Sequence, residues 1–436
     1  MKSLKKLLIS MLSLACLTVT AFAFASCDGE EEIPTYTVTF YTDGGNTIAP
    51  QTVEKGEKAE RPQIPTKEGY TFMGWYCGDE EWSFVGYTVT EDITLTACWR
   101  EEGYGYKFEE YDDYCAIVGC YLYENELVLP STHNGKPVKA IDEATFKEHN
   151  ILFKVVIPEG VEWISDSAFE NCVNLTVVQL PSTMQKIYDY AFKNCTSLQT
   201  VYLPDGLNVF GYGVFEGCTG LTSIQLPVGI KDIPYYTFKG CKSLTSITML
   251  GEVHSIMSKA FFGCESLREF TVPNAVDCIW DRAFYGCTSL KKIELSSKLT
   301  VIKEEAFAGC KMLAEVVLPE GLLSIGDGAF DGCEKIDKIV LPSTLYKIGA
   351  RAFLRCSFSK IIIPVGVTTI GEYAFQCSEP LKIYAEATAK PNDWHNSWWG
   401  GAWASQTVTV YWYSEGEPTQ EGNYWRYVDG LPVVWQ

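Results

Sequence analysis

Residues 290–310 read Leu-Lys-Lys-Ile-Glu-Leu-Ser-Ser-Lys-Leu-Thr-Val-Ile-Lys-Glu-Glu-Ala-Phe-Ala-Gly-Cys, and versions of this stretch return throughout the middle of the chain. Its phenylalanine, Phe307, has a counterpart every 23 residues in both directions, with one last step of 22. A fixed period of this length is typical of a stack of similar coils that share one core. The series consists of Phe146, Phe169, Phe192, Phe215, Phe238, Phe261, Phe284, Phe307, Phe330, Phe353 and Phe375.

Two further positions recur with the phenylalanine, except that His149 stands in the cysteine position after Phe146. We expect the recurring cysteines to be small buried hydrophobic residues with free thiols, although coils about 4.8 Å apart would lie within reach of a disulfide. The cysteine follows the phenylalanine by three residues, or by two after the short step, at Cys172, Cys195, Cys218, Cys241, Cys264, Cys287, Cys310, Cys333, Cys356 and Cys377. An aliphatic or aromatic residue precedes the phenylalanine by five residues, at Ile141, Ile164, Ile187, Phe210, Ile233, Ile256, Ile279, Ile302, Ile325, Ile348 and Ile370.

Each repeat also carries a segment that alternates like a strand. In Leu221–Pro227, two aliphatic residues flank one variable residue and proline follows. Alternation places the aliphatic residues on one face of a strand, and proline, which cannot donate to a ladder, ends it. The Ala-Phe-x-Gly-Cys piece is too short for a long helix and predicts a single helical turn, with Gly or Asn before Cys allowing a left-handed exit.

These repeats resemble the BspA-like leucine-rich repeat family over residues 131–386. The resemblance implies a mainly β fold, namely a right-handed leucine-rich-repeat solenoid of ten to eleven 23-residue coils with a short helical turn in each. Residues 101–130 predict an N-terminal cap over the first open face, and the Trp-rich residues 387–436 predict a C-terminal cap. Members of the family are surface proteins of host-associated microbes, so the resemblance implies binding to host matrix proteins or to other cells.

A separate module precedes the repeats at residues 36–100. Its opening VTFYTDGG, centre PTKEGYTFMGWY and end TEDITLTACW resemble the Listeria–Bacteroides repeat, or internalin-type B-repeat. The resemblance implies a small β-grasp-like domain that serves as a spacer or weak ligand binder. Cys77 and Cys98 fall at the ends of strands that could be neighbours, so they are either free or bridged to each other.

The N-terminus has the form of an export signal. Residues 1–26 combine a basic start, an apolar run and small residues, which is typical of a signal peptide rather than a spanning helix. Residues 24–27, Phe-Ala-Ser-Cys, resemble the bacterial lipobox, which implies lipidation of Cys27 and a tether at 27–35. The sequence therefore predicts an extracytoplasmic protein that a lipid holds at the cell surface. Ordinary cleavage near Ala25 is the alternative.

Charge and motifs exclude several functions. The formal net charge of −20 opposes binding to nucleic acid. The four histidines have no partner at metal-ligand spacing, and no phosphate-binding Gly-Lys loop or nucleophile elbow appears. We therefore expect no catalytic residue, no metal and no cofactor.

The outward positions of the predicted strands offer a candidate ligand surface. One interpretation is structural, because β-branched residues suit a sheet and lysine keeps it soluble. The other is a patch for a protein partner on the C-terminal half of the array. The candidate residues of the patch are Val317, Val340, Ile362, Tyr384, Lys292, Lys338, Lys360 and Lys382.

A second candidate function is carbohydrate or cell-wall binding through the Trp-rich C-terminal segment.

Overall fold

The computed structural model describes residues 33–101, 104–377, 380–400 and 407–435, so the predicted signal peptide and Cys27 lie outside the described residues. The chain separates into two compact units, residues 1–100 and 101–436. Strands are the only regular elements in the described ranges, and none of these ranges holds a helix long and apolar enough to cross a membrane.

The first unit is a five-stranded mixed sheet with the order β2-β1-β5-β3-β4. The neighbouring strands β1 and β5 run parallel, and β2 pairs antiparallel with β1, as does β4 with β3. Trp75 is buried in this unit, with its ring 5.0 Å from that of Phe40 and 5.4 Å from that of Phe72. The strands are β1 (Thr35–Tyr41), β2 (Gln51–Glu54), β3 (Tyr70–Cys77), β4 (Glu80–Glu81) and β5 (Ile93–Glu101).

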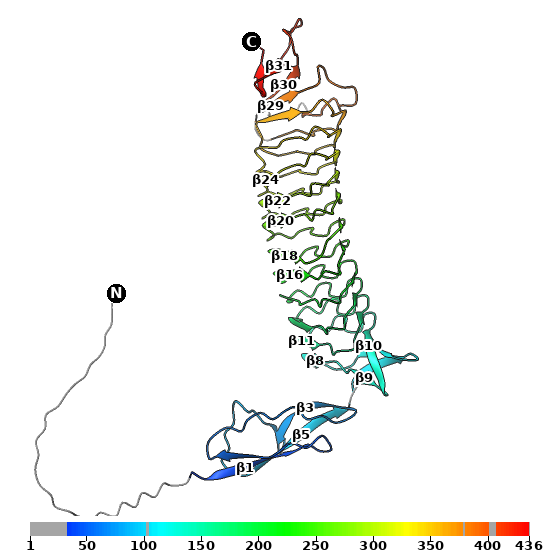
Figure 1. Ribbon diagram of the computed structural model, residues 1–436, viewed down its shortest axis with the longest axis vertical. Coiled ribbons are helices and arrows are strands. Elements are labelled where there is room, and N and C mark those ends of the chain that lie inside the picture. The colour runs from blue at the N-terminus through cyan, green and yellow to red at the C-terminus, as the bar shows by residue number, and fades with distance from the viewer. Residues whose placement is uncertain (1–32, 102–103, 378–379, 401–406, 436) are drawn as a thin grey trace, which may run out of the picture. The chain divides into compact units, whose positions relative to one another are not determined.

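The second unit is a stack of coils in which most coils contribute to two parallel ladders (Figure 1). The first ladder is made by the alternating segments, and we call its outward side the strand face. It consists of β8 (Glu126–Val128), β11 (Lys154–Val156), β13 (Val177–Gln179), β16 (Ser223–Leu226), β18 (Ser246–Met249), β20 (Glu269–Thr271), β22 (Lys292–Glu294), β24 (Glu315–Val316), β27 (Lys360–Ile363) and β29 (Leu381–Ala385).

The second ladder forms at the aliphatic position that precedes each phenylalanine. Its strands are mostly two residues long, yet they stay in register over many coils, as in the pairing of Ile302 with Ile325. They are β7 (Cys115–Cys120), β10 (Lys136–Ile141), β12 (Trp163–Ile164), β14 (Lys186–Ile187), β15 (Val209–Phe210), β17 (Asp232–Ile233), β19 (Ser255–Ile256), β21 (Cys278–Ile279), β23 (Val301–Ile302), β25 (Ser324–Ile325), β26 (Lys347–Ile348) and β28 (Thr369–Ile370).

The ladder of the strand face is interrupted, whereas the second ladder is nearly continuous. Residues 198–203 and 336–341 occupy the strand position of their coils but pair with neither neighbouring coil as strands. Between residues 232 and 370, by contrast, the second ladder runs through seven strands without a break. The coils are therefore held at regular spacing on one side and are less regularly paired on the other.

The segment around each phenylalanine forms turns instead of the expected helical turn. Glu305 and Gly309 have left-handed backbone angles, with φ of 50° and 73°. The N–H groups of Glu305, Phe307 and Gly309 consequently all point toward the next coil, where they donate to the carbonyls of residues 327, 329 and 331 at 2.7–2.8 Å. The sequence suggested a left-handed residue before Cys but not the second one before Phe, and two such residues are incompatible with a helix.

The phenylalanines form one continuous column in the core. Neighbouring rings lie 4.9–6.1 Å apart between centroids and are within 16° of parallel, from Phe146 to Phe375. All of these rings are buried. The column ends at Trp398, whose ring meets that of Phe375 edge-on at 5.9 Å.

The recurring cysteines are buried free thiols that also link successive coils. From Cys172 to Cys356, each Sγ lies 3.0–3.4 Å from the carbonyl oxygen of the phenylalanine one coil earlier. The Phe307 carbonyl, for example, accepts from the Cys310 N–H at 3.1 Å and from the Cys333 thiol at 3.2 Å.

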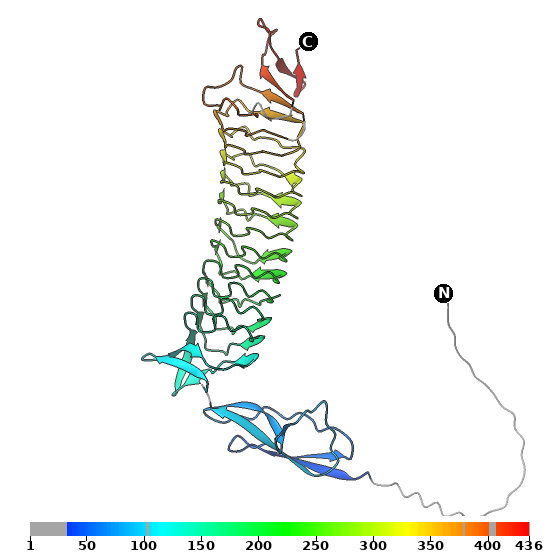
Figure 2. The same ribbon diagram turned by 180° about the vertical axis from the view of Figure 1, so that it is seen from behind.

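Both ends of the stack carry strands outside the repeat. At the start, β6 (Tyr106–Glu110) pairs antiparallel with β7, and β9 (Thr132–His133) with β10. At the other end, β30 (Val408–Tyr413) continues the ladder of β29, and β31 (Tyr424–Val428) and β32 (Leu431–Val434) form a hairpin beside it (Figure 2).

Candidate functional site

The candidate residues of the strand face differ in how far they reach solvent. Val317 and Val340 project outward and are 82% and 80% exposed. Ile362, two coils after Val317, is half-buried. The outward column of the last coils therefore presents apolar side chains to solvent at regularly spaced positions.

Tyr384 was expected in the same outward column, but it is not part of the exposed surface. Only 8% of Tyr384 is exposed. Its ring stacks on Tyr411 at 5.1 Å and meets Trp425 at 5.6 Å, so residues of β30 and β31 cover it. The expectation was wrong because the tail, which follows the last repeat, folds back over this position.

The four lysines of the candidate patch fall into two groups. Lys292 pairs with Glu294 of its own strand at 2.8 Å, and this hydrogen bond raises the pKa of Lys292. Lys338, Lys360 and Lys382 are exposed and form no ion pair with any residue that the structure describes. Three positive charges therefore remain available on the last coils of a strongly acidic chain.

Four of the candidate residues line one hollow of about 500 Å³, which we call the C-terminal groove. The groove opens at the interrupted part of the strand ladder, around residues 336–341. Its candidate residues are Lys338, Val340, Lys360 and Ile362, and its other lining residues include Glu320, Asp337, Leu341, Pro364, Glu386 and Tyr427. Val317, Lys292 and Lys382 lie outside it.

Two residues of this groove, Tyr427 and Glu386, were not predicted from the sequence. The Tyr427 hydroxyl donates to Glu386 Oε1 at 2.6 Å, and the Val365 N–H donates to Glu386 Oε2 at 2.9 Å. Burial, together with the hydrogen bond to the Glu386 carboxylate, raises the pKa of Tyr427. Tyr427 and Glu386 are separated by 41 residues, and no local pattern connects them, because Tyr427 reaches the groove only through the hairpin β31–β32.

Three of the described tryptophans of the C-terminal segment are not available as an open platform for sugars, whereas Trp399, Trp412 and Trp435 are half-buried. Trp394, Trp398 and Trp425 are buried. Trp394 Nε1 donates to the Val367 carbonyl at 3.1 Å, and Trp425 Nε1 donates to the Ala385 carbonyl at 2.9 Å. These rings therefore pack against the last coils, and the expected sugar-stacking surface lacks a fully exposed tryptophan in the described residues. Trp403 lies outside them.

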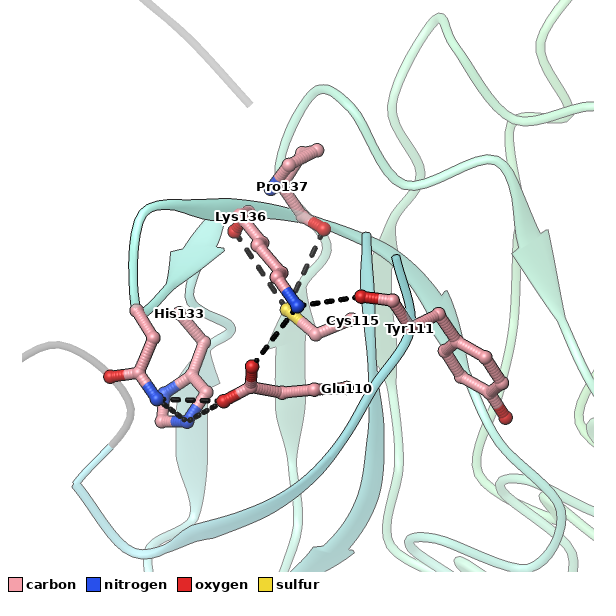
Figure 3. Close-up of polar contacts among 7 residues, drawn as sticks. Glu110, Tyr111, Cys115, His133, Lys136 and Pro137 are labelled. Carbon is pink, nitrogen blue, oxygen red and sulfur yellow. Dashed lines mark hydrogen bonds and ion pairs between the residues drawn. The ribbon is translucent and has the colours of Figure 1, made fainter. Parts of the chain in front are cut away.

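A polar cluster near the N-terminal end of the stack has the residue types of a reactive site (Figure 3). Glu110 accepts from Asn134 at 2.7 Å and pairs with Lys136 at 3.2 Å, and these contacts lower its pKa. The Cys115 thiol is fully buried and faces the carbonyls of residues 136 and 137 at 3.8 and 3.5 Å. These contacts join β6 and β7 to β9 and β10, which makes the cluster a clamp between strands.

The thiols have the wrong environment for nucleophilic chemistry. Burial raises the pKa of Cys172 and Cys218 to about 12, and it also raises the pKa of most of the other recurring cysteines of the stack. The thiolate is the reactive form, so these side chains are inert in the folded stack. Cys77 and Cys98 are free. The described residues contain no group of three or more His, Cys, Asp and Glu placed to hold a metal ion.

Comparison with protein families agrees with the repeat pattern. The family described as "BspA type Leucine rich repeat region" matches in six copies over residues 117–245, 231–327 and 301–390, which together exceed half of the chain. The "Listeria-Bacteroides repeat domain" matches residues 36–98.

Individual relatives match short parts of the chain. Internalin H of Listeria monocytogenes is 41% identical over 78 residues, which are 17% of this chain and 14% of that protein. A protein of Evansella cellulosilytica that is named as a membrane protein is 42% identical over 81 residues, 18% of this chain and 12% of that one. The chain thus spans only 12–14% of the length of these relatives.

Solved structures of leucine-rich repeat proteins resemble the stack. The T. pallidum leucine rich repeat protein is 26% identical, covering 48% of this chain and 88% of that one, with a TM-score of 0.38. A leucine rich cell surface protein of Faecalibacterium prausnitzii is also 26% identical, covering 58% of this chain and 92% of that one, with a TM-score of 0.31.

Proposed function

The chain belongs to the BspA-type leucine-rich repeat family, and on that premise we propose that it is a non-enzymatic cell-surface protein that binds a protein partner through the C-terminal groove. The observation that carries the proposal is the meeting of apolar and unpaired basic side chains in one hollow. Val340 and Ile362 offer apolar contact, and Lys338 and Lys360 lie beside them without an ion pair in the described structure. Interfaces commonly combine an apolar centre with a charged rim.

The chemistry of the groove defines the partner. An apolar side chain of the partner would fill the space beside Val340, and carboxylates on either side of it would meet Lys338 and Lys360. Glu386 is held in place by Tyr427 and by the Val365 N–H, so it forms a fixed rim that disfavours a second acidic group there. The partner is therefore a protein segment with an apolar anchor and nearby acidic residues, of the kind that matrix or cell-surface proteins of a host could present.

Binding should depend on the two groove lysines. We would immobilise candidate matrix and host cell-surface proteins and measure binding of the mature chain from residue 28 by surface plasmon resonance. Reversing both charges, Lys338→Glu with Lys360→Glu, is expected to weaken binding by about tenfold or more, because like charges across an interface are costly. Lys231→Glu changes the same kind of exposed side chain on an earlier coil and serves as the matched control. Equal affinity of the double variant and the control would refute the groove as the binding site.

We also propose that the chain is extracytoplasmic and anchored by lipid at Cys27. The support is the sequence of the leader, since Cys27 lies outside the described residues. Metabolic labelling with a fatty-acid analogue should tag the wild-type chain and not a Cys27→Ser variant. If Cys27→Ser stays labelled, or if neither chain is labelled, the anchor is excluded.

The remaining segments receive structural roles in this proposal. Residues 101–130 and 387–436 cap the two ends of the stack, which is consistent with the pairing of β6 and β7 at one end and with the contact of Trp398 with Phe375 at the other. Residues 36–100 act as a spacer between the anchor and the repeats.

A further inference from the structure

A second hollow of about 410 Å³ lies on the strand face, several coils before the C-terminal groove. We call it the central groove. Three successive coils line it with two outward side chains each, so that the six form a grid, and β16 and β18 hold two of the rows in register. The six outward side chains are Thr200, Tyr202, Ser223, Gln225, Ser246 and Thr248, and all six are exposed.

The grid carries no charge and differs in this from the coils that follow it, although the outward residues Val177 and Gln179 of the preceding strand β13 are uncharged too. The following coils place charged residues at the same outward positions, beginning with Glu269 and continuing with Lys292 and Glu294. Every side chain of the grid instead ends in a hydroxyl or an amide, each able both to donate and to accept a hydrogen bond. On a chain with a formal charge of −20, a hollow lined by nine uncharged residues offers no attraction to ions.

Tyr202 supplies an exposed aromatic ring at one end of the grid. It is 86% exposed, and no ring contact within the described residues involves it. An aromatic ring held outward beside hydroxyl and amide groups can stack against the apolar C–H face of a sugar ring, while the neighbouring polar groups meet the sugar hydroxyls.

The main chain of the same coil adds further polar groups. Residues 200–203 make no main-chain hydrogen bond to a neighbouring coil within the described part of the chain, because the strand ladder is interrupted there. Within the described residues, the neighbouring coils therefore do not use the N–H and C=O groups beside Tyr202. The volume of the hollow also falls within the roughly 300–1,000 Å³ that is common for small-molecule sites.

From these observations we infer that the central groove binds a neutral oligosaccharide, with Tyr202 stacking on one sugar ring and Gln225, Ser246 and their neighbours bonding to its hydroxyls. The site is separate from the C-terminal groove, and the inference does not depend on the proposed protein partner. Peptide is the less suitable ligand because the apolar lining residues Val201 and Ile224 are buried beneath the grid, leaving no open pocket for a side-chain anchor.

The test is a calorimetric titration of the mature chain with neutral hexasaccharides of glucose, mannose, galactose and N-acetylglucosamine, and with an oligogalacturonate as the acidic comparison. At least one neutral sugar is expected to bind. Tyr202→Ala should weaken that binding by roughly fivefold, since ring contacts of this kind are worth about 1 kcal/mol, and Tyr202→Phe should preserve it. Tyr123→Ala, which removes a comparably exposed tyrosine near the N-terminal end of the stack, is the control.

The variants separate this site from the other groove. Tyr202 and Tyr123 are both exposed, so their substitution should leave the far-UV circular dichroism of the stack unchanged. Neutral-sugar binding that persists in the Lys338→Glu and Lys360→Glu double variant but falls with Tyr202→Ala would support the inference. Three results would overturn it: no binding of any neutral sugar, binding of the acidic sugar alone, or an affinity that Tyr202→Ala leaves unchanged.

Discussion

Removal of one ring from the middle of the phenylalanine column should destabilise the stack strongly. Phe307 is fully buried and lies 5.4 Å from Phe284 and 5.3 Å from Phe330, with all three rings nearly parallel. Phe307→Ala removes the ring and leaves a cavity between two coils that the second ladder holds at fixed spacing. The coils cannot close over this cavity without breaking that ladder, so we expect the free energy of unfolding to fall by about 3–5 kcal/mol, the range for such truncations.

Urea denaturation of the mature chain under reducing conditions, followed by far-UV circular dichroism, would measure this change. Phe153→Ala is the matched control, because Phe153 belongs to the same stack but is 44% exposed. The control should cost at most about 1 kcal/mol, as surface substitutions usually do. If Phe307→Ala costs no more than Phe153→Ala, the rings do not form a shared core and the account of the stack is wrong.

Three further predictions concern the thiols, the ion pairs of Glu170 and the contact of Trp398 with the last phenylalanine. At pH 8, iodoacetamide should label Cys98, which is exposed, whereas the recurring cysteines of the stack, which are buried, should react only after denaturation. Mass spectrometry would locate the label, and a disulfide between recurring cysteines would contradict the prediction. The Glu170 carboxylate lies 2.9 Å from the Lys147 ammonium and 3.4 Å from that of Lys193. Burial raises the pKa of Glu170, but the hydrogen bonds of Lys147 and Ser167 and the charge of Lys193 lower it, and the net effect is a pKa below 4.5. A carboxylate with a lowered folded-state pKa stabilises the fold at a pH above its unfolded-state pKa, so Glu170→Gln should reduce the free energy of unfolding by roughly 1–3 kcal/mol at pH 7. The difference from wild type should shrink as the pH falls below 4.5. A difference independent of pH would argue against the ion pair. Trp398→Ala should accelerate hydrogen exchange in β28 and leave β12 to β15 unchanged, because Trp398 covers only the last ring of the column; uniform acceleration would show that the cap acts on the whole stack.

The parts of the fold that repeat were predictable from the sequence. One phenylalanine, one cysteine and one aliphatic residue per 23 positions were enough to infer a shared core, because a single coil cannot bury these side chains alone. The second ladder was less visible, since its strands contain only two residues in most coils, and one apolar residue cannot show the alternation that marks a strand.

The turn conformation could not be predicted for a different reason. Lys259 and Arg282 adopt left-handed backbone angles two residues before the phenylalanine, with φ of 57° and 55°. Neither residue type signals that conformation, and it is maintained by the hydrogen bonds that their N–H groups donate to the next coil at 3.0 and 2.8 Å. Local sequence therefore predicted a helical turn where contacts between coils impose another geometry.

The candidate surface could be predicted only in part, because the repeat pattern shows which side a residue faces but not which distant segment packs there. The period placed Val317, Val340 and Lys338 outward, as the structure has them, because position within a strand decides the side that a residue faces. It could not show that Tyr427 would reach the groove or that the tail would cover Tyr384. It also could not show which strands would lose their pairing, because residues 198–203 and 336–341 follow the same pattern as coils that remain paired.

The turns around the phenylalanines give the stack a direction, and this direction limits how copies of the protein can assemble. Each coil from Phe146 onward sends its N–H groups toward the C-terminus, and the last donors, Tyr373 and Phe375, are taken up by the carbonyls of residues 397 and 398. A second copy that approached this end with its first coil would offer carbonyls to donors that are already occupied. Within the described residues, the donors Tyr373 and Phe375 of the last repeat are thus occupied, which opposes head-to-tail growth into a filament, the usual hazard of an open repeat, at this end.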